Sequence, residues 1–228
     1  MNFYWFGRHN NKDLGYVSDL LEDSGFYGWL IPYAAGQPDP FSRIARSLKT
    51  EQKLKYLVAV RPYTISHQYL LAISKSLDNI QEDRVRINFV PGLTYDEESY
   101  GGIFSEINDS SSFEDRKKYF CTYIEQWNNW DVKKPYTYVS GMSDDICPNL
   151  DSLGDCTIVN YSRVVDKTLD HSDKTKIIFL PFSDYLEEEL KIIKGLGYNN
   201  VMTHVLDKKD FDRALATIKN IKANETSL

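Results

Sequence analysis

The chain has 228 residues, with 33 acidic against 27 basic side chains and a net charge of −6 at pH 7. This length suffices for one large domain or two small ones, and the negative charge argues against nucleic acid or an anionic membrane as a partner. The three cysteines form no CxxC motif, which indicates reduced thiols in a cytoplasmic protein. The first residues form a short apolar run without a basic region, so we expect neither a signal peptide nor a membrane span.

Segments typical of strands and of helices alternate from one end of the chain to the other. In chain order we expect strand Asn2–Phe6, helix Lys12–Ser24, strand Tyr27–Ile31, helix Pro40–Leu48, strand Leu54–Val60, helix Ser66–Ile80, strand Val85–Val90, helix Ser112–Trp130, strand Tyr136–Val139, helix Met142–Leu153, strand Cys156–Asn160, helix Ser162–Leu169, strand Lys176–Phe182, helix Tyr185–Leu196, strand Val201–His204 and helix Asp207–Lys222. Local signals support these bounds: Gly25 can stop the first helix, and Asp39 can cap the second, with Pro40 in its first turn.

The segment from Leu54 to Val90 contains two apolar strands joined by one amphipathic helix. Such a unit makes its strands parallel, and both strands end on the same side of the sheet. Eight units of this kind close naturally into a (β/α)₈ barrel, so we expect one compact domain over residues 1–228, with short loops. An open doubly wound sheet is the alternative, because the sequence does not show whether the strand order reverses.

Residues that follow the strands form the ligand-binding face in both architectures. His9 follows the first strand and His204 ends the last, and these two strands are neighbours in a closed barrel, so the two imidazoles could converge in a catalytic site. The opposing interpretation is that each histidine is a polar residue without a role. The spacing of His, Asp and Glu predicts no metal site.

A turn of small residues, Ser140–Gly141–Met142–Ser143, leads from the fifth strand into the next expected helix. Backbone N–H groups at a helix start bind phosphate well, so this turn is a candidate phosphate site. Small residues also simply permit tight turns. The chain has no GxGxxG, no P-loop and no GxSxG motif.

The segment from Tyr27 to Gly102 resembles the bacterial luciferase-like flavin monooxygenases, and within them the alkanesulfonate monooxygenase branch. The resemblance extends over nearly the whole chain and rests on these matching pieces: FYWFG at the start, GWLIP (Gly28–Pro32), LKYLVAVRP (Leu54–Pro62), SLDNIQEDRVRINFVPG (Ser76–Gly92), SGMSD (Ser140–Asp144) and GLGYNNV (Gly195–Val201).

The resemblance implies a (β/α)₈ barrel that binds reduced FMN, or a deazaflavin, at the strand C-termini and oxidises a small organic substrate with O₂. It also implies a homodimer and a separate flavin reductase. By position, the flavin ring would lie against Ala59, Val60, Arg61 and Asn88, and the flavin phosphate would lie against Ser140, Gly141, Met142 and Ser143. His9 matches a site histidine of the alkanesulfonate branch.

This chain departs from the family pattern at several site positions. Gln37 stands where the sulfonate branch has a cysteine, and Phe179–Phe182 stands where it has an Arg-x-His pair. In the run Ser112–Lys117, only Arg116 and an acid remain of the family motif D-H-x-E-R-Y. The long family insertion before the eighth strand, which closes over the substrate, is missing.

Two other functions stay open at this level. The missing insertion and the replaced site residues favour a protein that binds or sequesters flavin without catalysis. A barrel of unrelated function, such as an isomerase, is a further alternative. That alternative predicts a glycine-rich phosphate site after the last two strands, where Pro181–Phe182 and Leu206–Asp207 contain no glycine.

Overall fold

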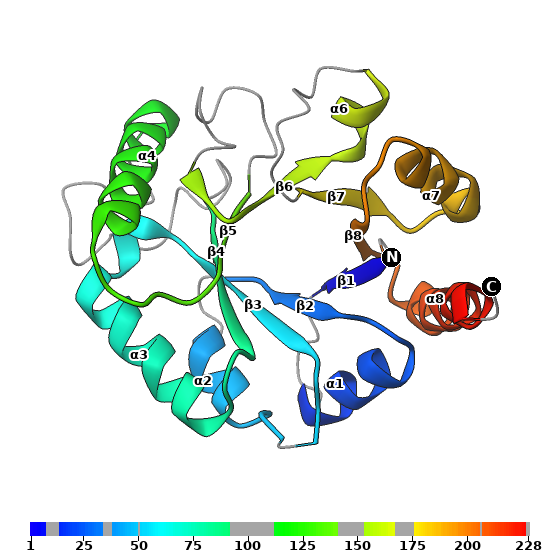
Figure 1. Ribbon diagram of the computed structural model, residues 1–228, viewed down its shortest axis with the longest axis horizontal. Coiled ribbons are helices and arrows are strands. Elements are labelled where there is room, and N and C mark those ends of the chain that lie inside the picture. Colours follow the sequence, from blue (N-terminus) through cyan, green and yellow to red (C-terminus); the bar gives the residue numbers. More distant parts are fainter. Residues whose placement is uncertain are drawn as a thin grey trace.

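Eight parallel strands close into a barrel in the order β1 to β8 (Figure 1). The computed structural model describes residues 1–7, 14–33, 38–49, 51–91, 112–140, 153–166, 176–205 and 207–226. The strands are β1 (Asn2–Phe6), β2 (Gly28–Ile31), β3 (Lys55–Val60), β4 (Val85–Phe89), β5 (Thr137–Ser140), β6 (Cys156–Asn160), β7 (Lys176–Pro181) and β8 (Asn200–His204). The predicted barrel is confirmed, and the open doubly wound sheet is excluded because β1 pairs with β8.

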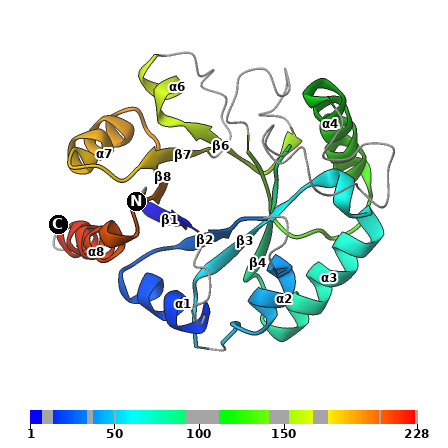
Figure 2. The same ribbon diagram turned by 180° about the vertical axis from the view of Figure 1, so that it is seen from behind.

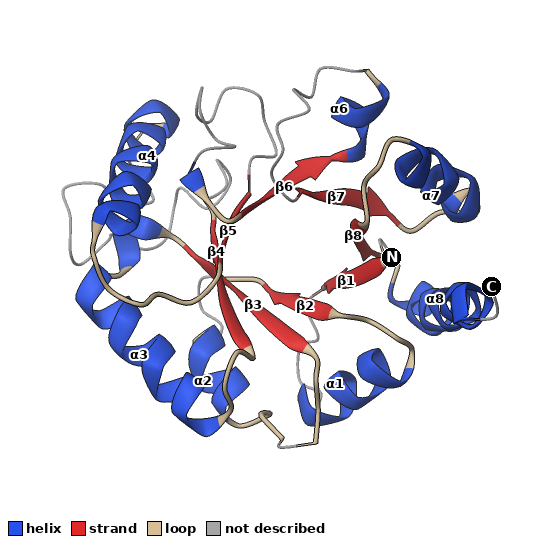
Figure 3. Cartoon of the chain, in the orientation of Figure 1, coloured by secondary structure: helices blue, strands red, loops and turns tan. Residues whose placement is uncertain are grey.

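The helices surround the barrel, as Figure 3 shows in blue outside the red strands and Figure 2 shows from behind. They are α1 (Leu14–Asp23), α2 (Pro40–Ala45), α3 (His67–Ile80), α4 (Phe113–Asn129), α6 (Tyr161–Val165), α7 (Leu186–Gly195) and α8 (Phe211–Thr226), with 3₁₀ turns at η1 (Pro62–Thr64) and η3 (Lys208–Asp210). The helix predicted at Met142–Leu153 lies outside the described residues, except for Leu153. None of the described helices is both long and apolar enough to cross a bilayer.

Side-chain caps fix where several helices begin. The Asp39 carboxylate accepts a hydrogen bond from the Ser42 amide at 2.9 Å, and Pro40 occupies the first helical position of α2. The Ser112 hydroxyl accepts from the Asp115 amide at 3.1 Å at the start of α4. After α1, Gly25 takes a φ of +82°, a conformation that glycine adopts without strain. The caps that the sequence predicts at Gly25 and Asp39 therefore form.

Alternation along each strand divides the apolar side chains into two clusters. One cluster fills the barrel interior, and its buried members are Tyr4, Leu30, Leu57, Ala59, Tyr138, Cys156, Ile158, Ile177 and Met202. The other lies between strands and helices and includes the fully buried Trp29 and Trp127. Because successive strand residues point to opposite faces, position in a strand decides whether a side chain can reach the barrel mouth.

The seam where the barrel closes brings the two ends of the chain together (Figure 1). The Met1 ammonium group pairs with a Glu225 carboxylate oxygen on α8 at 3.0 Å. The Asn2 amide donates to the Asn199 carbonyl at 2.7 Å, just before β8. This seam positions the ends of β1 and β8 side by side.

A polar group closes the N-terminal end of the barrel. Arg86 donates to the Tyr138 hydroxyl at 3.1 Å, and its guanidinium lies over the rings of Tyr136, at 4.8 Å, and Tyr27, at 5.9 Å. Burial raises the pKa of Tyr138 to about 12, although the charge of Arg86 opposes the shift. Asp83 completes the group, at 3.3 Å from Arg86 and 2.7 Å from Lys55. This end is sealed by ring contacts and ion pairs, which leaves the opposite end for a ligand.

Replacement of Asp83 by Asn should make the free energy of unfolding change less as the pH falls into the acid range. Burial alone would raise the pKa of Asp83, but Lys55 and Arg86 outweigh it and lower that pKa below 3.8. The carboxylate therefore stabilises the fold above pH 3.8, and this contribution is lost as the pH falls through the lowered pKa. Since the side chain is 62% exposed, we expect less than about 1 kcal/mol at pH 7.

Urea denaturation of wild type and Asp83→Asn between pH 7 and pH 3 measures this contribution. Asp83 has a φ of 54°, which Asn tolerates, so the variant keeps the backbone and loses only the charge. The gap in unfolding free energy should shrink at acid pH. A gap that stays constant across this range would contradict the assignment.

Candidate functional site

The carboxyl ends of the eight strands form one rim of the barrel, which we call the mouth. Among the described residues predicted there are Ala59 in β3, Arg61 directly after β3, Asn88 in β4, Ser140 in β5 and His204 in β8. Their spacing along the strands directs these side chains to the barrel interior. His9, Gly141, Met142 and Ser143 lie outside the described residues.

Asn88 and Ser140 form a buried polar pair on adjacent strands. The Ser140 hydroxyl donates to the Asn88 Oδ1 atom at 3.0 Å. Asn88 is fully buried, and among the described residues its Nδ2 group has no hydrogen-bond partner. A buried amide donor without a partner costs about 1–3 kcal/mol, so its retention at a strand end points to a ligand that accepts its hydrogen bond.

Val60 was predicted to face the ligand together with Ala59 and Arg61. Its side chain belongs instead to the outer cluster between strands and helices, whereas Ala59 belongs to the inner cluster. The Val60 carbonyl accepts from the Val90 amide at 3.0 Å within the sheet. Three consecutive strand residues cannot all point inward, because strand side chains alternate. Val60 therefore brings no side chain to the mouth.

Arg61 lies next to Ala59 at the end of β3. Only 3% of its surface is exposed, and its guanidinium stacks over the Tyr33 ring, 4.8 Å from the ring centroid. Tyr33 follows β2, so the contact joins two neighbouring strand ends. A guanidinium held in this way keeps its charge while its position is fixed. Among the described residues, Arg61 thus places a buried cation at the end of β3, the strand that pairs with the Asn88 strand β4.

On the other side of the mouth, three rings meet from β1, β7 and β8. His204 stacks on Phe179 with centroids 5.0 Å apart and an interplanar angle of 13°. Phe6 meets both of these rings edge-on, at 5.9 Å from His204 and 5.8 Å from Phe179. The sequence indicated His204 but not the two phenylalanines. Inward alternation in β1 and β7 was the signal that could have found them.

His204 should be neutral at pH 7. Burial lowers its pKa below the ordinary 6.5, and the buried Nδ1 atom has no hydrogen-bond partner in the part of the chain that the structure describes. We expect an NMR titration of the His204 ring to give a midpoint below pH 6.5. The His67 ring, whose pKa burial also lowers although its bond to the Tyr123 carbonyl opposes the shift, serves as an internal comparison. A His204 midpoint at or above 6.5 would show that a negative charge or solvent reaches the ring.

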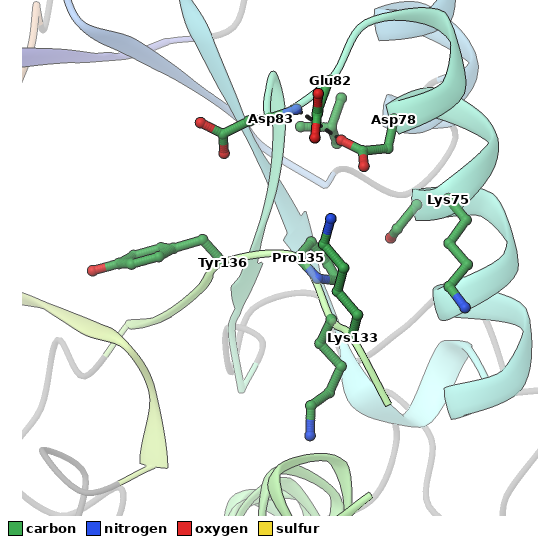
Figure 4. Close-up of a pocket in the computed structure, with 10 residues that line it drawn as sticks. Lys75, Asp78, Glu82, Asp83, Lys133, Pro135 and Tyr136 are labelled. Carbon is green, nitrogen blue, oxygen red and sulfur yellow. Dashed lines mark hydrogen bonds between the residues drawn. The ribbon is translucent and has the colours of Figure 1, made fainter. Parts of the chain in front are cut away.

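A cavity of about 270 Å³ lies far from the mouth, between α3 and the segment that precedes β5 (Figure 4). Its lining combines Lys75 and Lys133 with Asp78 and Glu82. Another groove, of about 340 Å³, lies along α7 and α8. Neither contains the residues predicted for the site. Among the described residues, no group of three or more His, Cys, Asp or Glu side chains could hold a metal ion.

No protein-family model matches the chain. Several solved structures, however, resemble this chain in fold. An F420-dependent secondary alcohol dehydrogenase in complex with an F420-acetone adduct has a TM-score of 0.69 and 11% identity over 96% of this chain and 97% of its own. The coenzyme F420 dependent tetrahydromethanopterin reductase from Methanopyrus kandleri has a TM-score of 0.62 and 11% identity, over the same shares of the two chains.

A third match is the oxygenating constituent of 3,6-diketocamphane monooxygenase from Pseudomonas putida, in complex with FMN. It has a TM-score of 0.52 and 14% identity, over 86% of this chain and 71% of its own. This chain shares their fold. At these identities the likeness shows the barrel alone, and function must be argued from the residues at the mouth.

Proposed function

We propose that this protein is a luciferase-like flavin-dependent oxidoreductase that binds reduced FMN, or a deazaflavin of the F420 kind, at the mouth of the barrel. The observation that carries the proposal is the fully buried Asn88 amide, which presents an unpartnered donor at the end of β4. The family resemblance of the segment Tyr27–Gly102 names the ligand class. The likeness to barrels solved with FMN or an F420 adduct supports it.

The described residues fit a flavin ring. Its carbonyl oxygens and ring nitrogens accept hydrogen bonds, and the Asn88 Nδ2 group is a donor that needs an acceptor. The Ser140 hydroxyl holds the Asn88 amide by its oxygen, which leaves the nitrogen for the ligand. The buried Arg61 guanidinium adds a positive charge near the ring, and such a charge favours a reduced, anionic flavin.

The phosphate end of FMN would be bound by the turn Ser140–Ser143, whose small residues can present backbone N–H groups at a helix start. His9 is proposed as a second site histidine, next to His204. Reduced flavin would supply a hydride or electrons for O₂ chemistry at this site. The protein's own part is to bind the ring, fix its position and keep His204 neutral beside it.

A second candidate function is flavin binding without catalysis. The observation that favours it is the short connection from β7 to β8, where only α7 and its two turns lie between Pro181 and Asn200. A flavin oxygenase needs a cover that excludes water from the reacting ring, and the missing insertion is the family's cover.

A homodimer and a separate flavin reductase are proposed from the resemblance alone.

Absorbance of the freshly purified protein, followed by anaerobic titration with FMN and with FMNH₂, tests the proposal. We expect saturable binding of a flavin, with the reduced form bound more tightly because of Arg61. Binding of neither flavin, nor of F420, would refute the proposal. Oxidation of bound FMNH₂ with formation of an oxygenated product separates the enzyme from the sequestering protein.

A further inference from the structure

The mouth has two chemically different halves. The polar half consists of Arg61, Asn88 and Ser140 at the ends of β3 to β5. The aromatic half consists of Phe6, Phe179 and His204 at the ends of β1, β7 and β8. In the closed strand order, β2 and β6 separate the two halves, so they face each other across the barrel.

We propose that the aromatic half binds the substrate, and that the substrate is a small neutral molecule with an apolar body and one hydroxyl or carbonyl group, which hydrogen-bonds to His204. The inference rests on the proposed function, in which the flavin ring occupies the polar half. It adds the substrate class, which neither the barrel fold nor the resemblance supplies.

The ring geometry gives the apolar part of this site. Phe6 and Phe179 are only partly buried and pack on the inner cluster of the barrel, so their remaining surface lies at the mouth. His204 stacks on Phe179 at 5.0 Å, which holds the imidazole plane. Three rings from three strands make a rigid apolar wall, suited to an aromatic or aliphatic body.

Hydrogen bonding gives the polar part. The His204 Nδ1 atom is buried without a partner, although neutral imidazole has one donor and one acceptor nitrogen. The neighbouring Phe6 and Phe179 rings contribute no hydroxyl or amide to it. A substrate hydroxyl group can hydrogen-bond to this nitrogen whether the nitrogen donates or accepts, and a substrate carbonyl group can do so where the nitrogen donates.

The described strand ends of the aromatic half present no cation to an anionic substrate. At the described ends of β6, β7, β8 and β1, the side chains that strand alternation directs to the mouth carry no charge: Phe6, Asn160, Pro181 and His204. Beyond them, Arg213 pairs with Asp184 at 2.9 Å and lies over the Phe182 ring, outside the barrel. A sulfonate or carboxylate bound on the aromatic half would lose its hydration without gaining a cation from these described side chains.

Three fluorinated probes of matched size test this inference: 4-fluorobenzyl alcohol, 4-fluorotoluene and 4-fluorobenzenesulfonate. Their binding to the FMN-saturated protein is measured by ¹⁹F line broadening, with competition by the unlabelled compound. We expect 4-fluorobenzyl alcohol to bind more tightly than 4-fluorotoluene, and 4-fluorobenzenesulfonate to bind most weakly. Phe179→Ala should weaken all binding, whereas His204→Phe should weaken the alcohol about two- to tenfold and leave 4-fluorotoluene unchanged, because only one hydrogen bond is lost.

Two matched variants control for general disturbance. Phe182→Ala removes a nearby ring that lies against Arg213 outside the barrel, and His67→Phe removes a half-buried imidazole on α3 whose ring centroid lies 3.8 Å from that of Tyr123 on α4. Both should keep wild-type probe affinities. FMN affinity is measured on the same samples. It shows whether each variant is folded, and it tests the proposed flavin binding separately from the proposed substrate site. The inference is overturned if FMN binds while the sulfonate binds as tightly as the alcohol, or while His204→Phe and Phe179→Ala leave probe binding unchanged. Absence of FMN binding refutes the proposed function instead.

Discussion

Asn88→Leu should lower the affinity for FMN roughly 10- to 100-fold, since a buried flavin acceptor left unpaired costs about 1–3 kcal/mol. The same substitution removes a buried donor without a partner among the described residues, which favours the fold, and the acceptor of the Ser140 hydroxyl, which disfavours it. Because these contributions oppose each other, we expect the unfolding free energy to stay within about 1 kcal/mol of wild type. The two effects are separable: fluorescence titration with FMN measures the first, and urea denaturation without flavin measures the second. A residue that served only the fold would show the reverse pattern.

Thr203→Val is the matched control for Asn88→Leu. The Thr203 hydroxyl is also fully buried, and it has no partner among the described residues. Thr203 lies two residues after Val201, which belongs to the outer cluster, so strand alternation directs Thr203 to the helix side of the sheet as well. We expect wild-type FMN affinity and equal or slightly higher stability. If both variants bind FMN as wild type does, Asn88 does not contact the flavin, and the site assignment is wrong.

Gly28→Ala should destabilise the protein by about 1–3 kcal/mol, the usual cost of an added methyl group in a packed interior. A Cβ atom on Gly28 would lie 2.7 Å from Cδ1 of Tyr4 and 3.2 Å from Cδ1 of Leu57. Both neighbours belong to the inner cluster, where the closed barrel leaves them little room to move. Thermal or urea unfolding followed by circular dichroism measures the loss.

Gly195→Ala is the comparison. Gly195 ends α7, and a Cβ atom there would meet no atom within 4 Å. Alanine restricts the unfolded chain more than glycine does, so we expect a gain of about 0.4–1 kcal/mol. Equal effects of the two substitutions would contradict the packing of Gly28 against Tyr4, and with it the closed interior of the barrel.

The sequence predicted the order and type of the elements well, because strong local signals mark them. β1 and β6 have the predicted bounds, and the strand pair β3 and β4 lies where the apolar runs of Leu54–Val90 indicated. Helix ends were less predictable. The predicted Pro40–Leu48 helix stops at Ala45, where the amides of Ser47 and Leu48 both turn to the Ile44 carbonyl. Such turns depend on the surrounding packing rather than on a local signal.

The residues of the candidate site also differ in how far the sequence could predict them. Arg61 and Ser140 lie at the ends of evident strands, and Asn88 was named by the family resemblance; their contact with a ligand stays a prediction. The Phe6–Phe179–His204 cluster was missed although the predicted closed barrel makes β1 and β8 neighbours, because the contact of the three rings depends on the register of β1, β7 and β8, which the sequence does not show.

A crystal structure of the protein soaked or co-crystallised with FMN under reducing conditions tests the central claim most directly. The account predicts flavin at the mouth of the barrel, with an acceptor of the ring within hydrogen-bond distance of Asn88 Nδ2 and the phosphate near Ser140. Flavin bound elsewhere, for example in the cavity between Lys75 and Lys133 (Figure 4), would contradict the account, as would an Asn88 amide that stays without a partner when the protein is saturated.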